Sequence, residues 1–458
     1  MLHLPKRTHI VAFCFLFASC IIHLYHSYNN VYFLIPDSYQ YLNRAQEIAA
    51  GKPLINPFRL PLYPLILKET LSLDGSQEIN STTLPNHPLR NVIILQEILT
   101  ILGLFFFLAI ASFLFGRNLP FMTVAFLFGL NINIFGWGKN ILTELTTIVI
   151  MIVLIYSCYQ YILRHRLLDL LLIPSLCTLL VLLRPIYLLL PFAILPPLMY
   201  FFIRHDKRTY AIFLAVFLIA TLFVPLLYVK ENTRLWGYSG ISTVSDHNLM
   251  AKTIQYQLDT RALSDDVYTL KLKNCINNYI PGKQLDIALY ECTTSLGITN
   301  DPYDVQSAKI TRSFTREIIA NQPILYLSQS IKLIPTVLTN TKPDPIDWIS
   351  TYSSIPILSR LWAFFHRFFN SLQIVTLSFL IFFPLHIIRF LRNPTLENTC
   401  LFVIGSIILY QIFSTALFVH INYIRLRAPI EALLLLFCGY YIANLIEKGY
   451  LLLKGHQR

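Results

Sequence analysis

An acidic residue, Asp37, stands at the start of a polar stretch that directly follows the first apolar segment of the chain. A positioned carboxylate can accept the proton of an attacking hydroxyl group, which is general-base catalysis. The stretch covers residues 36–64 and closes on a proline-rich segment. We predict that Asp37 is a catalytic base. The residues predicted to position a substrate in the same loop are Arg59, Tyr63 and Tyr41.

Further charged residues fall at the ends of apolar segments or in short polar turns between them. Charges near membrane depth are costly and tend to mark function. Glu144 is the second candidate for a catalytic carboxylate. Arginine suits an anionic phosphate because its guanidinium group stays charged and can bond in a bidentate manner. The residues predicted to bind a donor phosphate are Arg184, Arg425, Arg427 and Lys139.

Each of these residues also has a structural interpretation. Asp37 is suited to capping the helix that follows it, because an anion favours a helix N-terminus. Glu144 fits an interfacial acid that faces water, and Arg184 fits a turn residue that snorkels to lipid headgroups. Arg59 is equally suited to holding its loop, and the tyrosines to anchoring the chain at the membrane interface. At least one of the two C-terminal arginines is expected to have only such a role.

The composition indicates a protein with many membrane spans. The chain has 458 residues, of which 55% are hydrophobic and 13% charged, whereas soluble domains carry about 25% charged residues. Several apolar runs approach or exceed the roughly 20 residues that cross a bilayer. The formal charge of +12 reflects Lys and Arg in short loops on one membrane side. We therefore expect the lipid bilayer, and not nucleic acid, as a partner.

The predicted fold class is all-α, with about ten transmembrane helices and up to 12. An N-terminal module, residues 1–229, holds the loop 26–90, and the C-terminal helices occupy 371–458. The region between them, 230–370, is predicted to be a large extracytoplasmic loop region with interfacial helices. The spans are expected at about 8–25, 92–115, a third ending near 135, 141–162, 167–183, 186–202, 210–228, 372–388, 399–419 and 428–446.

Two helices are predicted in the first loop. The first runs over about 38–50, with Asp37 or Ser38 as its cap and Gly51 at its end. Its spacing of apolar residues suits the membrane interface. A second short interfacial helix is expected at about 60–73.

The large loop region is predicted to mix polar helices with turns. Residues 307–321 are predicted to form a helix, and 324–338 an amphipathic segment that lies on the membrane. Cys275 and Cys292 are the cysteines in this polar region. In an oxidising compartment they are expected to form a disulfide; the alternative is two unpaired thiols. No cysteine or histidine spacing resembles a metal site.

Four features together resemble the GT-C superfamily of membrane glycosyltransferases, above all the branch of protein O-mannosyltransferases and bacterial lipid A aminoarabinose transferases. The resemblance covers about the first two hundred residues well and the last fifty loosely, and each motif alone has low specificity. The features are Asp37-Ser38-Tyr39 before a helix that ends at Gly51, the stretch from Arg59 to Pro64, Glu144 followed by a later Arg184-Pro185, and Tyr423 to Pro429 before the last span.

The resemblance implies a GT-C-like bundle that takes a sugar from a polyprenyl-phosphate lipid and transfers it to an acceptor. It assigns the role of the first-loop acid to Asp37. Many O-mannosyltransferases have Asp-Glu here, whereas this chain has Asp37-Ser38; this favours a lipid or glycan acceptor over a protein. No nucleotide cofactor is expected, because the donor is already lipid-linked and no Asp-x-Asp motif is present, while a divalent metal stays open. The implied location is the bacterial inner membrane, with the active site on the periplasmic face.

Three other functions remain open at the level of the sequence. A transporter or flippase for lipid-linked saccharides would also have many spans and a charged cavity, although such proteins often show repeats and broken helices. A membrane assembly factor without catalysis would not need a buried acid. A polysaccharide polymerase or ligase would share the lipid-linked donor.

Overall fold

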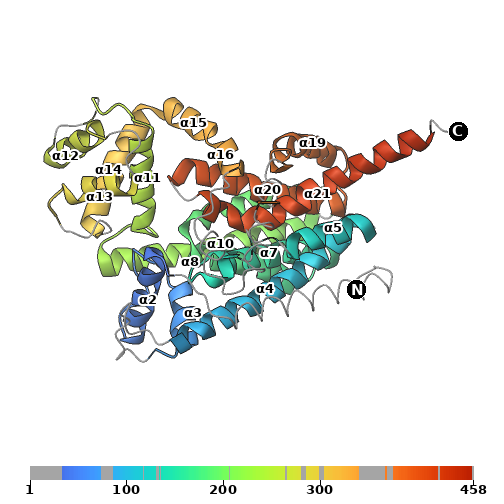
Figure 1. Ribbon diagram of the computed structural model, residues 1–458, viewed down its shortest axis with the longest axis horizontal. Coiled ribbons are helices and arrows are strands. Elements are labelled where there is room, and N and C mark those ends of the chain that lie inside the picture. Colours follow the sequence, from blue (N-terminus) through green and yellow to red (C-terminus); the bar gives the residue numbers. More distant parts are fainter. Residues whose placement is uncertain are drawn as a thin grey trace.

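The computed structural model shows an all-helical protein, as the sequence predicts (Figure 1). Within the part of the chain that the structure describes, no regular element is a β-strand. The described residues are 34–73, 86–116, 118–129, 131, 134, 136–205, 207–261, 263, 266–279, 285–298, 304–339, 367–368, 375–420 and 423–455.

Among the described residues, 6 helical segments are long and apolar enough to cross a membrane. We therefore treat the chain as an integral membrane protein. Three shorter apolar helices, α5 (Asn118–Gly129), α8 (Leu167–Leu183) and α19 (Phe379–Arg392), pack with them. The long segments are α4 (Asn86–Phe115), α7 (Glu144–Arg164), η2 with α9 (Pro185–Leu189 and Leu190–His205), α10 (Lys207–Trp236), α20 (Leu396–Phe418) and α21 (Tyr423–Gly455).

Each predicted span from 92–115 onward coincides with one of these helices. The first predicted span, at about 8–25, lies outside the described residues. Three of the coinciding helices, α5, α8 and α19, are shorter than the roughly 20 residues that cross a bilayer.

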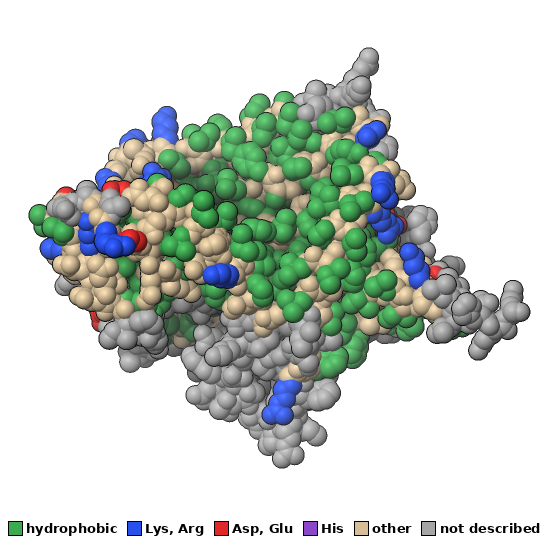
Figure 2. Space-filling view, turned by 90° about the horizontal axis from the view of Figure 1, so that it is seen from above, with side chains coloured by type: hydrophobic (Ala, Val, Ile, Leu, Met, Phe, Trp, Pro, Cys, Tyr) green, Lys and Arg blue, Asp and Glu red, His purple; other side chains and the backbone are tan. Residues whose placement is uncertain are grey.

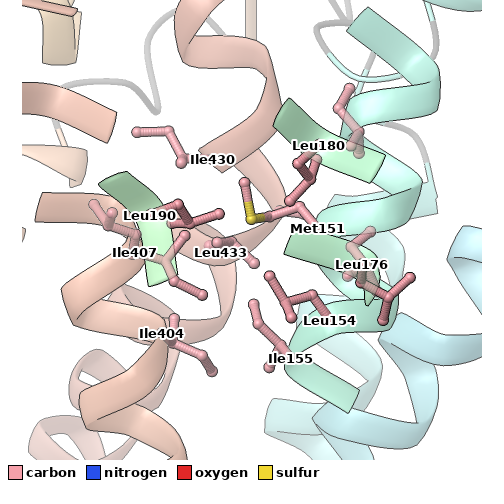
Figure 3. Close-up of a cluster of buried hydrophobic side chains, with 14 of the residues drawn as sticks. Met151, Leu154, Ile155, Leu176, Leu180, Leu190, Ile404, Ile407, Ile430 and Leu433 are labelled. Atoms are coloured by element: carbon pink, nitrogen blue, oxygen red, sulfur yellow. The ribbon is translucent and has the colours of Figure 1, made fainter. Parts of the chain in front are cut away.

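The bundle is centred on α7, which is buried along most of its length. Figure 3 shows its aliphatic side chains meeting those of the helices around it. Aliphatic side chains from five elements pack closely here and form part of the apolar core of the bundle. The labelled side chains come from α7 (Met151, Leu154, Ile155), α8 (Leu176, Leu180), α9 (Leu190), α20 (Ile404, Ile407) and α21 (Ile430, Leu433).

Two short helices precede the first described span. They are α2 (Pro36–Ala49) and α3 (Leu62–Leu71), and they pack on each other. The predicted cap of α2 is wrong: the helix begins earlier, with Ile35 as its N-cap and Pro36 in the first turn. Proline favours this position because its φ is preset and its missing N–H is not needed there. Gly51 ends the helix as predicted, with a φ of 82° that glycine adopts without strain.

Four helices form a separate lobe beside the bundle (Figure 1, left). We call α11 (Thr243–Gln255), α12 (Val267–Asn277), α13 (Leu285–Thr294) and α14 (Val305–Asn321) the helical lobe. The lobe has its own apolar core, which includes Met250, Leu272 and Phe314. The predicted helix at 307–321 is α14. Its N-cap is Asp304, whose carboxylate accepts the backbone N–H groups of Gln306 and Ser307.

Two helices lead from the lobe back to the bundle. They are α15 (Pro323–Lys332) and α16 (Ile334–Thr339), and both pack against α20. The face in Figure 2 carries hydrophobic side chains across its middle, while Lys and Arg side chains gather toward its ends. An apolar surface of this extent fits contact with lipid.

Candidate functional site

The site is built around Asp37, in the first turn of α2. Its carboxylate does not cap the helix and instead forms ion pairs with two arginines. Arg59 Nη2 lies 2.6 Å from Asp37 Oδ1. Arg425 Nη1 lies 2.8 Å from Asp37 Oδ2. The fold thus brings together a residue from the first loop and one from the start of the last helix.

A second carboxylate, Glu144, continues this network. Arg425 Nε lies 2.6 Å from Glu144 Oε1, and Arg184 Nη2 lies 2.5 Å from the same oxygen. Arg184 Nε also donates to Thr143 Oγ1 at 2.7 Å. Arg425 therefore bridges the two predicted catalytic carboxylates. We call Asp37, Arg59, Glu144, Arg184 and Arg425 the charge cluster.

Arg59 is fixed by a loop that turns on Asn56. The side-chain oxygen of Asn56 accepts the backbone N–H of Phe58 at 2.7 Å and that of Arg59 at 3.3 Å. This local bond is the usual reason that asparagine favours turns. The guanidinium of Arg59 also donates to Gln40 on α2. It lies 4.7 Å from the centre of the Tyr41 ring, which suits a cation–π contact.

The charge cluster has an excess positive charge. Among the five residues of the cluster, three guanidinium groups face two carboxylates, so their formal charges sum to +1. The side chain of Glu144 is fully buried, whereas that of Asp37 is 30% exposed. The arginine side chains are between 10% and 12% exposed. The cluster is therefore closed around Glu144 and open at Asp37, where an anionic ligand would add a balancing charge.

Asp37 is ionised at neutral pH. Burial alone would raise the pKa of its carboxyl group, but the charges of Arg59 and Arg425 and their hydrogen bonds hold that pKa well below its usual range. A carboxylate held in this way is a weak base until one of its arginines finds another anion.

Several buried polar atoms around Glu144 have no hydrogen-bond partner among the described residues. They are Glu144 Oε2, Arg184 Nη1, Tyr63 OH and Tyr187 OH. Both tyrosines are close enough to Glu144 to interact with its charge. Buried polar groups are normally satisfied by protein or ordered water. These atoms are thus available to a ligand or to water.

The tyrosines predicted in the first loop lie beside the cluster. The rings of Tyr41 and Tyr63 meet edge to face, with their centres 5.2 Å apart. Burial, together with the nearby Glu144 and Tyr41, raises the pKa of Tyr63 well above its usual value. Its hydroxyl group therefore stays protonated and can donate a hydrogen bond.

Two predicted phosphate-binding residues make contacts outside the charge cluster. Arg427 lies two residues after Arg425, but its Nε pairs with Glu431 at 2.9 Å and its Nη1 donates to the carbonyl of Leu338. Lys139, in the short helix η1 (Gly136–Lys139), has Glu97 as a charged neighbour. Burial lowers the pKa of Lys139 to about 8, against the effect of Glu97. These partners do not belong to the charge cluster.

Sequence reasoning missed three residues of this region. Gln40 lies one turn after Asp37, Thr143 immediately precedes Glu144, and Tyr187 follows Arg184-Pro185. Their only signal was closeness to a predicted residue, because neutral polar side chains are common at helix ends.

The two lobe cysteines are placed as a pair. A disulfide joins Cys275 on α12 to Cys292 on α13, with the Cα atoms 5.4 Å apart. Among the residues that the structure describes, no group of three or more His, Cys, Asp or Glu side chains could hold a metal ion.

No family model and no curated protein matches the chain. Two of the solved structures that are similar to it are of ArnT from Cupriavidus metallidurans, and in each case the similarity covers 93% of this chain and 78% of that chain. The structure bound to undecaprenyl phosphate is 11% identical with a TM-score of 0.36, and the apo structure is 12% identical with a TM-score of 0.37. A likeness at this level establishes neither a shared fold nor a shared activity, so the function proposed below rests on the residues of the chain itself.

Proposed function

We propose that the chain is a glycosyltransferase that moves a sugar from a polyprenyl-phosphate-linked donor to a lipid, glycan or protein acceptor, with Asp37 as the general base. The observation that carries this proposal is the charge cluster. It combines a partly exposed carboxylate with three guanidinium groups and a net charge of +1. A sugar phosphodiester carries one negative charge and would neutralise the cluster.

The proposed reaction uses both kinds of charge. The acceptor oxygen bonds to the anomeric carbon of the sugar as the bond from that carbon to the phosphate oxygen breaks. The acceptor proton passes to Asp37, and the lipid phosphate leaves with the bonding electron pair. Arg425, Arg59 and Arg184 stabilise the charge that grows on the phosphate. An arginine that moves toward the phosphate weakens its hold on Asp37, which makes the carboxylate a better base.

The ends of the helices support an active site on the non-cytoplasmic face. Glu144 begins α7, Arg425 lies in the first turn of α21, and Arg184 follows the end of α8. The opposite ends of the helices carry basic residues, among them Arg164 on α7 and Arg204 on α9. Basic residues mark the cytoplasmic ends of membrane helices. The resemblance implies the bacterial inner membrane as the location, and in that membrane the charge cluster would face the periplasm.

The proposal is tested by sugar transfer with purified protein in nanodiscs. The donors are polyprenyl-phosphate sugars carrying labelled hexoses or pentoses, with membrane lipids and glycans as acceptors. We expect Asp37→Asn to lower the transfer rate by about 10²–10⁴-fold. Asp37→Glu keeps the negative charge but moves the carboxylate, so it should also transfer poorly while keeping the thermal stability of the wild type.

The matched control is Glu431→Gln. Glu431 is a buried carboxylate of α21 that pairs with Arg427 at 2.9 Å. Its loss should lower stability without a comparable fall in transfer. A wild-type transfer rate in Asp37→Asn would show that Asp37 is not the general base, and Glu144 would then be the candidate to test. An inactive wild type that carries the labelled lipid across a vesicle membrane would favour the transporter instead.

A further inference from the structure

Lys252 is a buried lysine that the proposed reaction does not use. It lies in the last turn of α11 and is fully buried. Its Nζ donates to the hydroxyl groups of Tyr256 at 3.2 Å and Tyr423 at 3.4 Å. It also lies 5.2 Å and 5.5 Å from the centres of these two rings. Among the described residues, no carboxylate pairs with it.

A lysine in this position costs stability. Removing an ammonium group from water without a paired anion is unfavourable. Burial accordingly lowers the pKa of Lys252 to about 7. A methionine would fill the same space without that cost. A residue that weakens the fold in this way is expected to serve a function.

The contacts of Lys252 lead to the charge cluster. Tyr423 is the first residue of α21 and stands two positions before Arg425. Gln255 Nε2 donates to the same Tyr423 hydroxyl at 3.4 Å. Two side chains of α11 therefore hold the turn that carries Arg425. Tyr256, the other partner of Lys252, donates to the carbonyl of Ala416 on α20 at 3.2 Å.

The opposite end of α11 holds the loop of Arg59. The backbone N–H of Thr243 donates to the carbonyl of Pro57 at 2.7 Å. Ser242 Oγ donates to the carbonyl of Phe58 at 3.1 Å. Each arginine that pairs with Asp37 is thus attached to one end of the same helix, although the two arginines are far apart in the sequence.

We propose that Lys252 is a positioning residue for Arg425, acting through the hydroxyl group of Tyr423, and that α11 holds both arginines of Asp37 in register. The inference rests on the proposed transferase function and extends it to the helical lobe. The lobe then sets the geometry of the charge cluster from outside the membrane bundle.

The first test compares Lys252→Met and Tyr423→Phe with the wild type. Tyr423→Phe keeps the ring and removes only the hydroxyl group. A misplacement of about 1 Å can cost on the order of 100-fold in rate, so we expect each variant to lower kcat by at least about tenfold. Lys252→Met should unfold at the same temperature as the wild type or higher. Wild-type kcat in both variants would overturn the proposal.

A double-mutant cycle separates positioning from a general structural role. If Lys252 acts through Arg425, then Lys252→Met should cause little further loss of kcat in an Arg425→Lys background. Independent losses that multiply would overturn the proposal. The control is Lys273→Met: Lys273 is also buried, but its Nζ donates to the carbonyl of Leu263 inside the lobe. This control should leave kcat unchanged.

Hydrogen–deuterium exchange tests whether Lys252 positions Arg425, and it does not require an assay of sugar transfer. In Lys252→Met and Tyr423→Phe, peptides that contain Arg425 should exchange faster than in the wild type, and in Lys273→Met they should not. An inactive wild type would defeat the proposed function, and the exchange data would still decide the positioning. Unchanged exchange around Arg425 in both variants would overturn the inference.

Discussion

Arg425 is the residue on which the two carboxylates of the charge cluster depend. Its guanidinium group bonds Glu144 through Nε and Asp37 through Nη1. A planar fork of donors can serve two carboxylates at once, whereas the ammonium group of lysine is a single point of charge. Arg427 makes a different set of bonds, to Glu431 and to the carbonyl of Leu338.

We therefore expect Arg425→Lys and Arg427→Lys to differ in kind. Removal of one transition-state donor typically costs about 10²–10³-fold in rate, so Arg425→Lys should lower transfer by roughly 100-fold with little change in unfolding temperature. Arg427→Lys should lower the unfolding temperature and change the rate by no more than a few-fold. Transfer rates and thermal unfolding of both purified variants check this. Equal rate losses would return Arg427 to the set of phosphate ligands.

The sequence could predict which residues share a membrane face but not which ones touch. The order of the predicted spans placed Asp37, Glu144, Arg184 and Arg425 on one face of the membrane. It could not separate Arg425 from Arg427, because both precede the last span. Residues i and i+2 of an α-helix point in directions roughly 200° apart around the helix axis. The side chains of Arg425 and Arg427 therefore leave α21 on nearly opposite sides. Only the packing of α21 against α7 decides which one meets Glu144.

The sequence predicted that short helices lie between the spans. It predicted their boundaries less well. The amphipathic segment expected at 324–338 is a pair of helices, α15 and α16, with a break near Leu333. The inward side of α15 is tied to the bundle, since Tyr326 donates to the carbonyl of Leu417 at the end of α20. Its outward side exposes Ile324, Leu327 and Ile331. These spacings of three and four residues form one apolar stripe.

We expect this stripe of α15 to lie in the bilayer interface, because α20 is a membrane span and ends beside it. An Ile324→Trp variant in liposomes should have more tryptophan fluorescence than the wild type. Brominated lipids should quench this additional fluorescence. Val267→Trp, at an exposed position on α12 of the lobe, is the matched control and should be quenched much less. Equal quenching at the two positions would show that α15 has no special contact with lipid.

At the scale of the whole molecule, the described residues form two apolar cores, one in the bundle and one in the helical lobe. The proposed boundaries at 230 and 370 stay a prediction, although the helices of the lobe fall between them. Composition was enough to predict a polar region there, because its hydropathy falls. The way the lobe holds the charge cluster was not predictable, since the hydrogen bonds from α11 go to backbone carbonyls and a tyrosine hydroxyl, which leave no pattern in the sequence.

The disulfide between Cys275 and Cys292 should matter for the lobe and hardly at all for the bundle. A cross-link over a sequence separation of 17 is expected to contribute about 3 kcal/mol by restricting the unfolded chain. In the Cys275→Ala/Cys292→Ala double variant, hydrogen exchange in α12 and α13 should speed up, while exchange in α7 and α8 stays the same. The control is Cys400→Ala, at a buried free thiol of α20, which should leave the lobe unchanged.

The same double variant connects the lobe to the reaction. Since α11 packs against α13 and α14, a loosened lobe should hold Arg59 and Arg425 less firmly as the temperature rises. Transfer by the double variant should therefore match the wild type at low temperature and fall off at a lower temperature, while the bundle is still folded. A decline that coincides with unfolding of the bundle would mean that the lobe does not set the geometry of the charge cluster.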